Sequence, residues 1–270
     1  MSGSSGSQEG ETGRLFIPLH DANSLRYIRL QYVTIGLIAA NVLIFFATSL
    51  GSETATLAAS YGFGFIPSVA FDMVDLPPEL YYVPESATWL TYAFVHNDIF
   101  HLVGNMLFLW VFGDNVEDAL GHVRFLIFYL LCAAAGAALH GSLIPASQVP
   151  LIGASGAIAG VVAAYLMLHP RVKIWVLAFA RIPLRIPAWI VLTLWIGFQV
   201  LMLLANGEEQ VSWACHVGGI IAGIVLLPIM KRRGVPLFDR EVVTPTAVEV
   251  RQPSALRPQS SRPAPRWGRQ

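Results

Sequence analysis

Six stretches of the chain are almost continuously apolar, and polar residues are concentrated between them. The apolar stretches cover residues 32–50, 100–117, 123–143, 153–169, 186–205 and 212–230. A helix needs about 20 apolar residues to cross the hydrocarbon core of a bilayer, and each stretch is near that length. The pattern therefore predicts an all-α membrane protein with six transmembrane helices.

The segments at the two ends of the chain are polar. Residues 1–13 are rich in Gly and Ser, and residues 234–270 are rich in Pro, Arg and Ser without a helical pattern. Such compositions bury too little apolar surface to fold. We therefore expect a disordered tail over residues 1–25, a six-span domain over residues 26–233, and a second disordered tail over residues 234–270.

The composition is that of a membrane protein. Hydrophobic residues make up 55% of the chain and charged residues only 13%, whereas a soluble domain has about 25% charged residues. The mean hydropathy is +0.59. The formal net charge is zero, which gives no reason to expect a nucleic-acid partner. The expected surroundings are a lipid bilayer.

The positions of Lys and Arg predict the orientation of the spans. The first loop (51–99), the third loop (144–152) and the fifth loop (206–211) contain neither residue type. The positive-inside rule then places both termini in the cytoplasm and the odd loops outside. Residues 1–13 have no basic amphipathic pattern and no cleavable signal precedes residue 32, which favours a multi-pass protein of a bacterial inner membrane.

The first loop is long and contains many aromatic residues between Gly and Pro. The aromatic side chains are Tyr61, Phe63, Phe65, Phe71, Tyr81, Tyr82 and Trp89. Aromatic residues of this kind suit the membrane interface. We expect a loop that is partly embedded in the outer leaflet; the alternative is a small folded outer loop with an aromatic core of its own.

Polar side chains inside membrane spans are costly, so each one is a candidate for function. The second span contains His101 and Asn105, whose spacing places them on one face of a helix. His96 lies just before that span. The fourth span opens with Ser155 between small residues, and His216 is the only histidine of the last span.

Ser155 and His216 have the properties of a catalytic pair. A serine hydroxyl needs a neighbouring base to act as a nucleophile, and the predicted orientation places both residues near the outer face. The glycine pairs at 156 and 160 and at 219 and 223 would let their helices approach closely. No Asp or Glu occurs between residues 119 and 207, so we predict a dyad without a carboxylate.

Attack on a peptide bond creates an oxyanion that needs hydrogen-bond donors. The side chains of His101 and Asn105, with the backbone N–H of Ser155 at the start of a helix, are the candidates. Taken singly, each residue has a structural alternative. Ser155 could be a helix cap or a packing residue, and His101 and Asn105 could bond neighbouring helices together.

Other hydrolytic chemistries fit the sequence less well. An intramembrane metalloprotease would need an H-E-x-x-H motif, which the chain lacks, so no metal and no cofactor are expected. Asp114, Glu117 and Asp118 cluster at the end of the second span, where helix capping and packing explain them. Cys132 and Cys215 lie in apolar runs and are interpreted as small buried residues.

Together, the motifs resemble the rhomboid family of intramembrane serine proteases. They are His96 and His101-Leu-Val-Gly-Asn105, then Phe112-Gly-Asp-Asn-Val-Glu117 with Gly121, then Gly153-Ala-Ser155-Gly156, and Cys215-His216-Val-Gly-Gly219-Ile-Ile-Ala-Gly223. Their order and spacing cover residues 26–230.

The resemblance implies a rhomboid-type bundle of six helices with a water-filled cavity that opens to the outside. It implies Ser155 as nucleophile and His216 as general base, and an oxyanion hole formed by His101, Asn105 and the Ser155 amide. Gly153 would shape the turn that presents Ser155, with Gly156 and His96 in support. Substrates would be single-span membrane proteins, cut near the outer end of their helix.

Entry of the substrate would be between the second and fifth spans, with Trp195 and Phe198 as candidate gate residues. Two positions depart from the pattern of many relatives: Leu90 follows Trp89 where an Arg is common, and Ala159 stands where an aromatic residue would stack on the catalytic histidine. The alternative functions are a non-catalytic membrane protein that binds client helices, or a transporter of small solutes.

Overall fold

The computed structural model describes residues 16–21, 23, 25–49, 53–178, 182–205 and 212–239. The helices are α1 (Tyr32–Ser49), α2 (Glu53–Phe63), α3 (Pro67–Ala70), α4 (Glu85–Thr91), α5 (Ile99–Leu120), α6 (His122–Leu143), α7 (Ser155–Leu168), α8 (Ala188–Leu204) and α9 (Trp213–Met230), with 3-10 turns η1 (Pro78–Leu80) and η2 (Tyr92–Phe94). The strands are β1 (Phe16–Asp21), β2 (Lys173–Ala178) and β3 (Ile182–Pro187).

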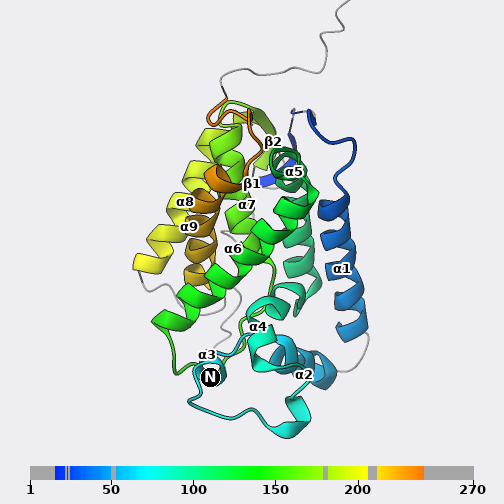
Figure 1. Ribbon diagram of the computed structural model, residues 1–270, viewed down its shortest axis with the longest axis vertical. Coiled ribbons are helices and arrows are strands. Elements are labelled where there is room, and N and C mark those ends of the chain that lie inside the picture. Colours follow the sequence, from blue (N-terminus) through cyan, green and yellow to red (C-terminus); the bar gives the residue numbers. More distant parts are fainter. Residues whose placement is uncertain are drawn as a thin grey trace, which may run out of the picture.

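Six of the helices, α1 and α5 to α9, coincide with the six apolar stretches of the sequence and run lengthwise through the molecule (Figure 1). Among the described residues, α5, α6 and α9 are long and apolar enough to cross a membrane, and α1, α7 and α8 are shorter apolar helices. The protein is therefore a mostly helical membrane protein. The number of six spans remains a prediction.

Helix α7 lies at the centre of the bundle and is formed mainly by small residues. It packs against α5, α6, α8 and α9, and a Cβ atom added at Gly219 would overlap the carbonyl oxygen of Gly156. One turn further on, a Cβ at Gly223 would overlap the carbonyl oxygen of Gly160. The glycines therefore allow the backbones of α7 and α9 to come into direct contact.

Helix α8 lies at the edge of the bundle. Its buried residues are Ala188, Leu192 and Gln199, whereas Leu194, Leu201 and Leu204 are exposed. A helix that is apolar on its outer face suits a lipid environment. It packs mainly against α9 and α7, so one narrow face of α8 makes its contacts with the bundle.

The first loop folds into α2, α3, α4, η1 and η2, at the end of the bundle opposite the sheet (Figure 1). The rings of Phe65 and Trp89 lie 4.8 Å apart at 65°, and Tyr92 is fully buried with its hydroxyl donating to the carbonyl of Ala133. This packing fits the alternative of a folded loop with an aromatic core. The embedding of the loop in a bilayer stays a prediction.

The opposite end carries an antiparallel sheet in the order β1-β2-β3, so the prediction of an all-α protein is wrong in this respect. Val172, Ile174 and Val176 are buried while Lys173 and Trp175 between them are exposed. This alternation is typical of a strand, but it lies in a loop that the sequence analysis used only for its charges.

The ordered part of the chain is longer at both ends than predicted. Residues 16–21 are not disordered but form β1, whose Phe16 pairs with Ala178 of β2. Residues 234–239 also pack against the bundle, because Phe238 N–H donates to the carbonyl of Met167 and Asp239 forms an ion pair of 3.3 Å with Arg26. Both segments are held in place by contacts with residues that are distant in the sequence, and local composition does not predict such contacts. Residues 1–15 and 240–270 lie outside the described part of the chain.

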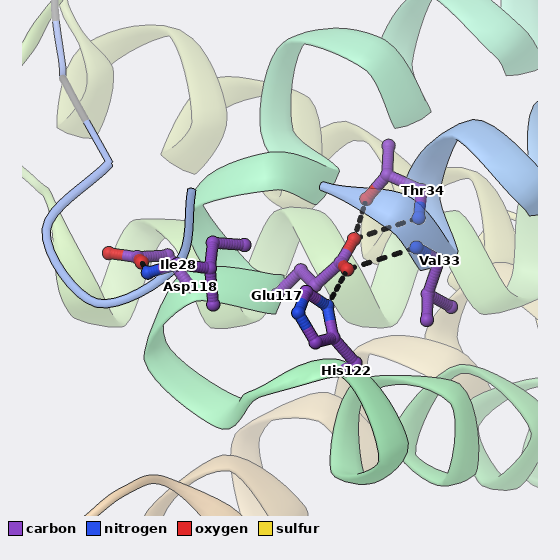
Figure 2. Close-up of polar contacts among 6 residues, drawn as sticks. All are labelled: Ile28, Val33, Thr34, Glu117, Asp118 and His122. Atoms are coloured by element: carbon purple, nitrogen blue, oxygen red, sulfur yellow. Dashed lines mark hydrogen bonds and ion pairs between the residues drawn. The ribbon is translucent and has the colours of Figure 1, made fainter. Parts of the chain in front are cut away.

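Two neighbouring carboxylates at the end of α5 hold the chain that leads into α1 (Figure 2). Glu117 is fully buried and accepts hydrogen bonds from Val33 N, Thr34 N, Thr34 Oγ1 and His122 Nδ1. Asp118 accepts from the backbone N–H groups of residues 26, 27 and 28 at 2.7 to 2.8 Å. Glu117 thus caps the start of α1, and Asp118 binds the segment that precedes it, so both carboxylates have structural roles.

Candidate active site

Ser155 and His216 lie within hydrogen-bond distance, although 61 residues separate them in the sequence. Ser155 is the first residue of α7, and His216 lies in the first turn of α9. The distance from His216 Nε2 to Ser155 Oγ is 2.8 Å. His216 is 8% exposed and Ser155 is half-buried. A nucleophile and a base in this arrangement are suited to acyl transfer.

The turn that leads into Ser155 requires a glycine. Gly153 has a φ of +110°, a conformation that residues with a side chain rarely adopt. A Cβ atom at this position would also lie 2.6 Å from two ring atoms of His101. Gly153 N–H donates to the carbonyl of Tyr92 at 2.9 Å, which ties the turn to the folded first loop.

His216 is placed by the N-terminal cap of α9. The hydroxyl of Ser212 accepts a hydrogen bond from Cys215 N–H at 3.2 Å, so α9 starts at a defined residue. Gly156 of α7 lies against Cys215, since a Cβ atom there would overlap its Sγ. The helix start and this close contact together fix the depth of His216 relative to Ser155.

A third residue, which the sequence analysis missed, completes the hydrogen-bond chain. His216 Nδ1–H donates to Oε1 of Gln199 at 2.7 Å, and Gln199 is buried. An amide oxygen only accepts, so Nδ1 carries the proton and Nε2 presents a lone pair to the hydroxyl of Ser155. Gln199 is the only amide in the apolar stretch 186–205, and the rule applied to His and Asn in other spans would have found it.

An aromatic ring also packs beside the imidazole. The ring of Trp195 lies 6.4 Å from that of His216 at an angle of 29°, and Trp213 approaches the imidazole edge-on at 6.1 Å. Trp195 packs against the small cluster that contains Ala159. The space that an aromatic residue at position 159 would fill in α7 is thus taken by a side chain from α8.

The candidate oxyanion residues gather around Gly153. The ring of His101 contacts Gly153, and Asn105 Nδ2 lies 3.7 Å from the position of a Cβ there. Asn105 donates to Nε2 of His96 at 3.0 Å, and burial lowers the pKa of His96 to about 3, so this ring is neutral. Asn105 Nδ2 has a second N–H, which could serve as a hydrogen-bond donor to another group.

His101 has a more restricted role in this arrangement. Its Nδ1–H donates to Oδ1 of Asn97 at 3.1 Å, so the Nε2 of a neutral ring beside Gly153 carries no proton. To donate to an oxyanion, His101 would need either a second proton or an Asn97 amide turned over. Asn105 is therefore the better-prepared donor of the two side chains.

The two candidate gate residues face different helices. The ring of Trp195 lies 5.9 Å from that of Phe108 on α5, so this contact joins α8 to α5. The ring of Phe198 lies 5.5 Å from Trp213 at the start of α9. Trp195 is therefore the residue that bridges the second and fifth predicted spans.

Within the described ranges, no group of three or more His, Cys, Asp or Glu side chains is placed to hold a metal ion. The polar groups around Ser155 are hydroxyl, imidazole and amide groups that bond to one another. Their arrangement is suited to proton transfer between Ser155 and His216.

The sequence is similar to proteins of one known family. A family model described as Rhomboid domain matches residues 84–233, more than half of the chain. RHOMBOID-like protein 12, mitochondrial, from Arabidopsis thaliana is 31% identical over 54% of this chain and 47% of the relative. Rhomboid protein 1, mitochondrial, from Saccharomyces cerevisiae is 30% identical over 53% of this chain and 42% of the relative.

A bacterial relative is more distant. Rhomboid protease GluP from Bacillus subtilis is 28% identical over 69% of this chain and 32% of the relative. The chain thus spans less than half the length of these three relatives. Because two of the three are named as mitochondrial, the expected location in a bacterial inner membrane is not supported.

Proposed function

The chain belongs to the rhomboid family, and from that premise we propose that it is a serine-type intramembrane endopeptidase that uses a Ser155–His216 dyad. The observation that carries the proposal is the 2.8 Å distance between His216 Nε2 and Ser155 Oγ, with the proton of His216 held on the far nitrogen by Gln199. A serine that served only as a helix cap would have no need of a buried imidazole in this tautomer.

The reaction would proceed in two acyl-transfer steps. His216 Nε2 takes the proton of Ser155 as Oγ attacks the carbonyl carbon of the substrate, and then gives that proton to the leaving amine. Water, deprotonated by His216, next attacks the ester carbonyl, and His216 gives that proton to Ser155 Oγ as the bond between Oγ and the acyl group breaks. The backbone N–H of Ser155 and the second N–H of Asn105 are the proposed donors to the oxyanion, with His101 beside them.

We propose that the substrates are single-span membrane proteins and that the enzyme itself crosses a lipid bilayer six times. The apolar outer face of α8 and the Trp195–Phe108 contact support an entry between α5 and α8. Ser155 lies toward the end of the bundle that carries the first loop, so the cut would fall near that end of the substrate helix. A helix hides its carbonyl groups in hydrogen bonds, so the cut segment must unwind to react.

Reconstitution into liposomes with a single-span substrate tests this function. We expect the wild-type chain to cleave the substrate, and we expect Ser155→Ala and His216→Ala to reduce cleavage by about 10⁴-fold or more. A fluorophosphonate should label the wild-type chain but not Ser155→Ala. Substrate binding without cleavage would instead favour a client-binding protein, and solute flux without either would favour a transporter. Unchanged cleavage by Ser155→Ala would show that the dyad assignment is wrong.

A further inference from the structure

Two side chains of one helix hold His216 from the side opposite Ser155. Gln199 and Trp195 are four residues apart on α8, so they lie on the same face of the helix. The first accepts a hydrogen bond from the imidazole at 2.7 Å, and the second lies against its ring at 6.4 Å and 29°. His216 is therefore placed between Ser155 on α7 and this face of α8.

We propose that Gln199 and Trp195 are positioning residues, through which α8 fixes the tautomer and the orientation of His216. The proposal rests on the proposed function, because it concerns the base of that reaction. It places the support of the dyad on the helix at the edge of the bundle.

The burial of Gln199 is the first argument. The residue is 3% exposed in a helix whose other buried residues, Ala188 and Leu192, are apolar. A buried amide without a partner destabilises a protein, whereas a buried apolar residue of similar size stabilises it. Packing alone would therefore favour leucine or methionine here, whereas the hydrogen bond to His216 explains a glutamine.

The chemistry of the acceptor is the second argument. An imidazole that serves as a base must keep its lone pair on the nitrogen that faces the nucleophile, so the other nitrogen must hold the proton. A carboxylate usually accepts that proton's hydrogen bond, but no Asp or Glu occurs between residues 119 and 207. The Gln199 oxygen performs the same selection of tautomer without placing a charge in the span.

The ring of Trp195 restricts the second degree of freedom, the rotation of the imidazole about its side-chain bonds. Ala159 on α7 is fully buried and small, and Trp195 packs against the cluster it belongs to. The same ring contacts Phe108 of α5 at 5.9 Å. Trp195 therefore links the orientation of His216 to the seam between α5 and α8.

The kinetic test uses the full chain in liposomes with the single-span substrate. We expect Gln199→Leu to lower kcat by about 10-fold or more, because losing the partner that sets the tautomer of a catalytic histidine turns the wrong nitrogen to the nucleophile, with KM changed less than about twofold. Gln199→Glu, which keeps an acceptor oxygen, should retain more activity than Gln199→Leu.

Trp195→Ala should lower kcat more than Trp195→Phe does. Thr193→Leu, an exposed position on the same helix, is the matched control.

A spectroscopic readout separates positioning from mere loss of fold and from failure of the proposed function. In nanodiscs with ¹⁵N-labelled histidine, the His216 signal, identified by its loss in His216→Ala, should report Nδ1–H in the wild type. In Gln199→Leu, part of the His216 population should change to the Nε2–H tautomer. Gln199→Met repeats the test if the leucine variant does not fold.

The outcomes of the two readouts are distinct. An unchanged tautomer together with wild-type kcat in the folded variants would overturn the positioning role, even if the wild type cleaves its substrate. A wild type that does not cleave would overturn the proposed function, and the tautomer measurement would still decide the role of Gln199.

Discussion

At the end of the bundle that carries Ser155, buried polar side chains bond to one another, whereas at the sheet end two buried carboxylates, Glu117 and Asp118, bond mainly to the backbone. The Ser155–His216–Gln199 chain contains only groups that are neutral at rest. Glu117 and Asp118 instead bind backbone N–H groups of the segment that leads into α1 (Figure 2). The protein thus uses full charges for architecture and neutral hydrogen bonds for the candidate chemistry.

The physical reason for this division is the cost of burying a charge. A carboxylate is stable in an apolar interior only when donors surround it, and the start of a helix supplies unpaired N–H groups with a favourable dipole. The Nδ1 atom of His216 instead faces the interior of α8, whose backbone N–H groups are already paired within the helix, so a neutral side-chain amide is the less costly acceptor there.

The largest expected change in stability comes from removing a buried carboxylate at the sheet end. Glu117→Leu leaves the backbone N–H groups of residues 33 and 34 and the side chain of His122 without their acceptor. We expect a loss of about 4 kcal/mol in the free energy of unfolding, because each buried donor that is left without an acceptor costs about 1 to 3 kcal/mol.

Unfolding in mixed detergent and dodecyl sulfate micelles measures this change. Glu79→Leu is the control, since Glu79 is an exposed acid of the first loop. Glu117→Leu, where it remains folded, should keep the His216 tautomer of the wild type, because Glu117 lies at the other end of the bundle. A stability loss no larger than that of the control would show that Glu117 is not a structural anchor.

A somewhat smaller effect is expected from pH at the same end. Asp21 is buried and accepts from Tyr165 Oη at 2.7 Å and from Asn115 Nδ2 at 2.9 Å. Burial raises the pKa of Asp21 from 3.8 to about 6, with the Tyr165 hydrogen bond opposing the rise. The folded protein therefore binds this proton more tightly than the unfolded chain does.

The sign of the pH dependence follows from that difference. The contribution of protonated Asp21 to stability is complete below about pH 4 and is lost as pH rises through about 6, with a total of about 3 kcal/mol. Thermal unfolding from pH 4 to pH 8 should show this decline in the wild type and a smaller one in Asp21→Asn. Equal declines in both proteins would contradict the role of Asp21.

The smallest expected effect on stability is at the dyad end. Gly153→Ala places a Cβ atom at a φ of +110° and 2.6 Å from the ring of His101, a strain on the order of 1 to 3 kcal/mol. Because the strained turn presents Ser155, the variant should lose cleavage activity even under conditions in which it remains folded. Gly104→Ala, where a Cβ meets nothing within 4 Å, should leave both unchanged. Wild-type cleavage by Gly153→Ala would show that the turn does not depend on glycine.

The helices of the bundle were predictable from the sequence because their signal is local. The stretch 123–143 became α6 (His122–Leu143), and the stretch 100–117 became α5 (Ile99–Leu120). Each helix satisfies its backbone within its own segment, so composition alone identifies it. The residues of the candidate dyad were also predictable, because a serine between small residues and a lone histidine are conspicuous in apolar stretches.

The missed features depend on partners that are distant in the sequence. The segment 16–21 becomes a strand because Lys173–Ala178 lies beside it. Gln199 was not predicted because carboxylates are the usual partners of a catalytic histidine, and Trp195 was predicted only as a gate residue. Position 159 was interpreted as a missing aromatic ring, although its small size makes room for a ring from another helix.

The pairing of β1 has a consequence for the order in which the chain folds. Phe16 lies opposite Ala178, so β1 cannot join the sheet until the ribosome has made most of the bundle. The start of α1 likewise has to wait for Glu117 before its first N–H groups find their acceptor. Such long-range contacts close slowly. Residues 16–21 and the start of α1 are therefore synthesised before their partners, and they reach their places only after those partners have been made.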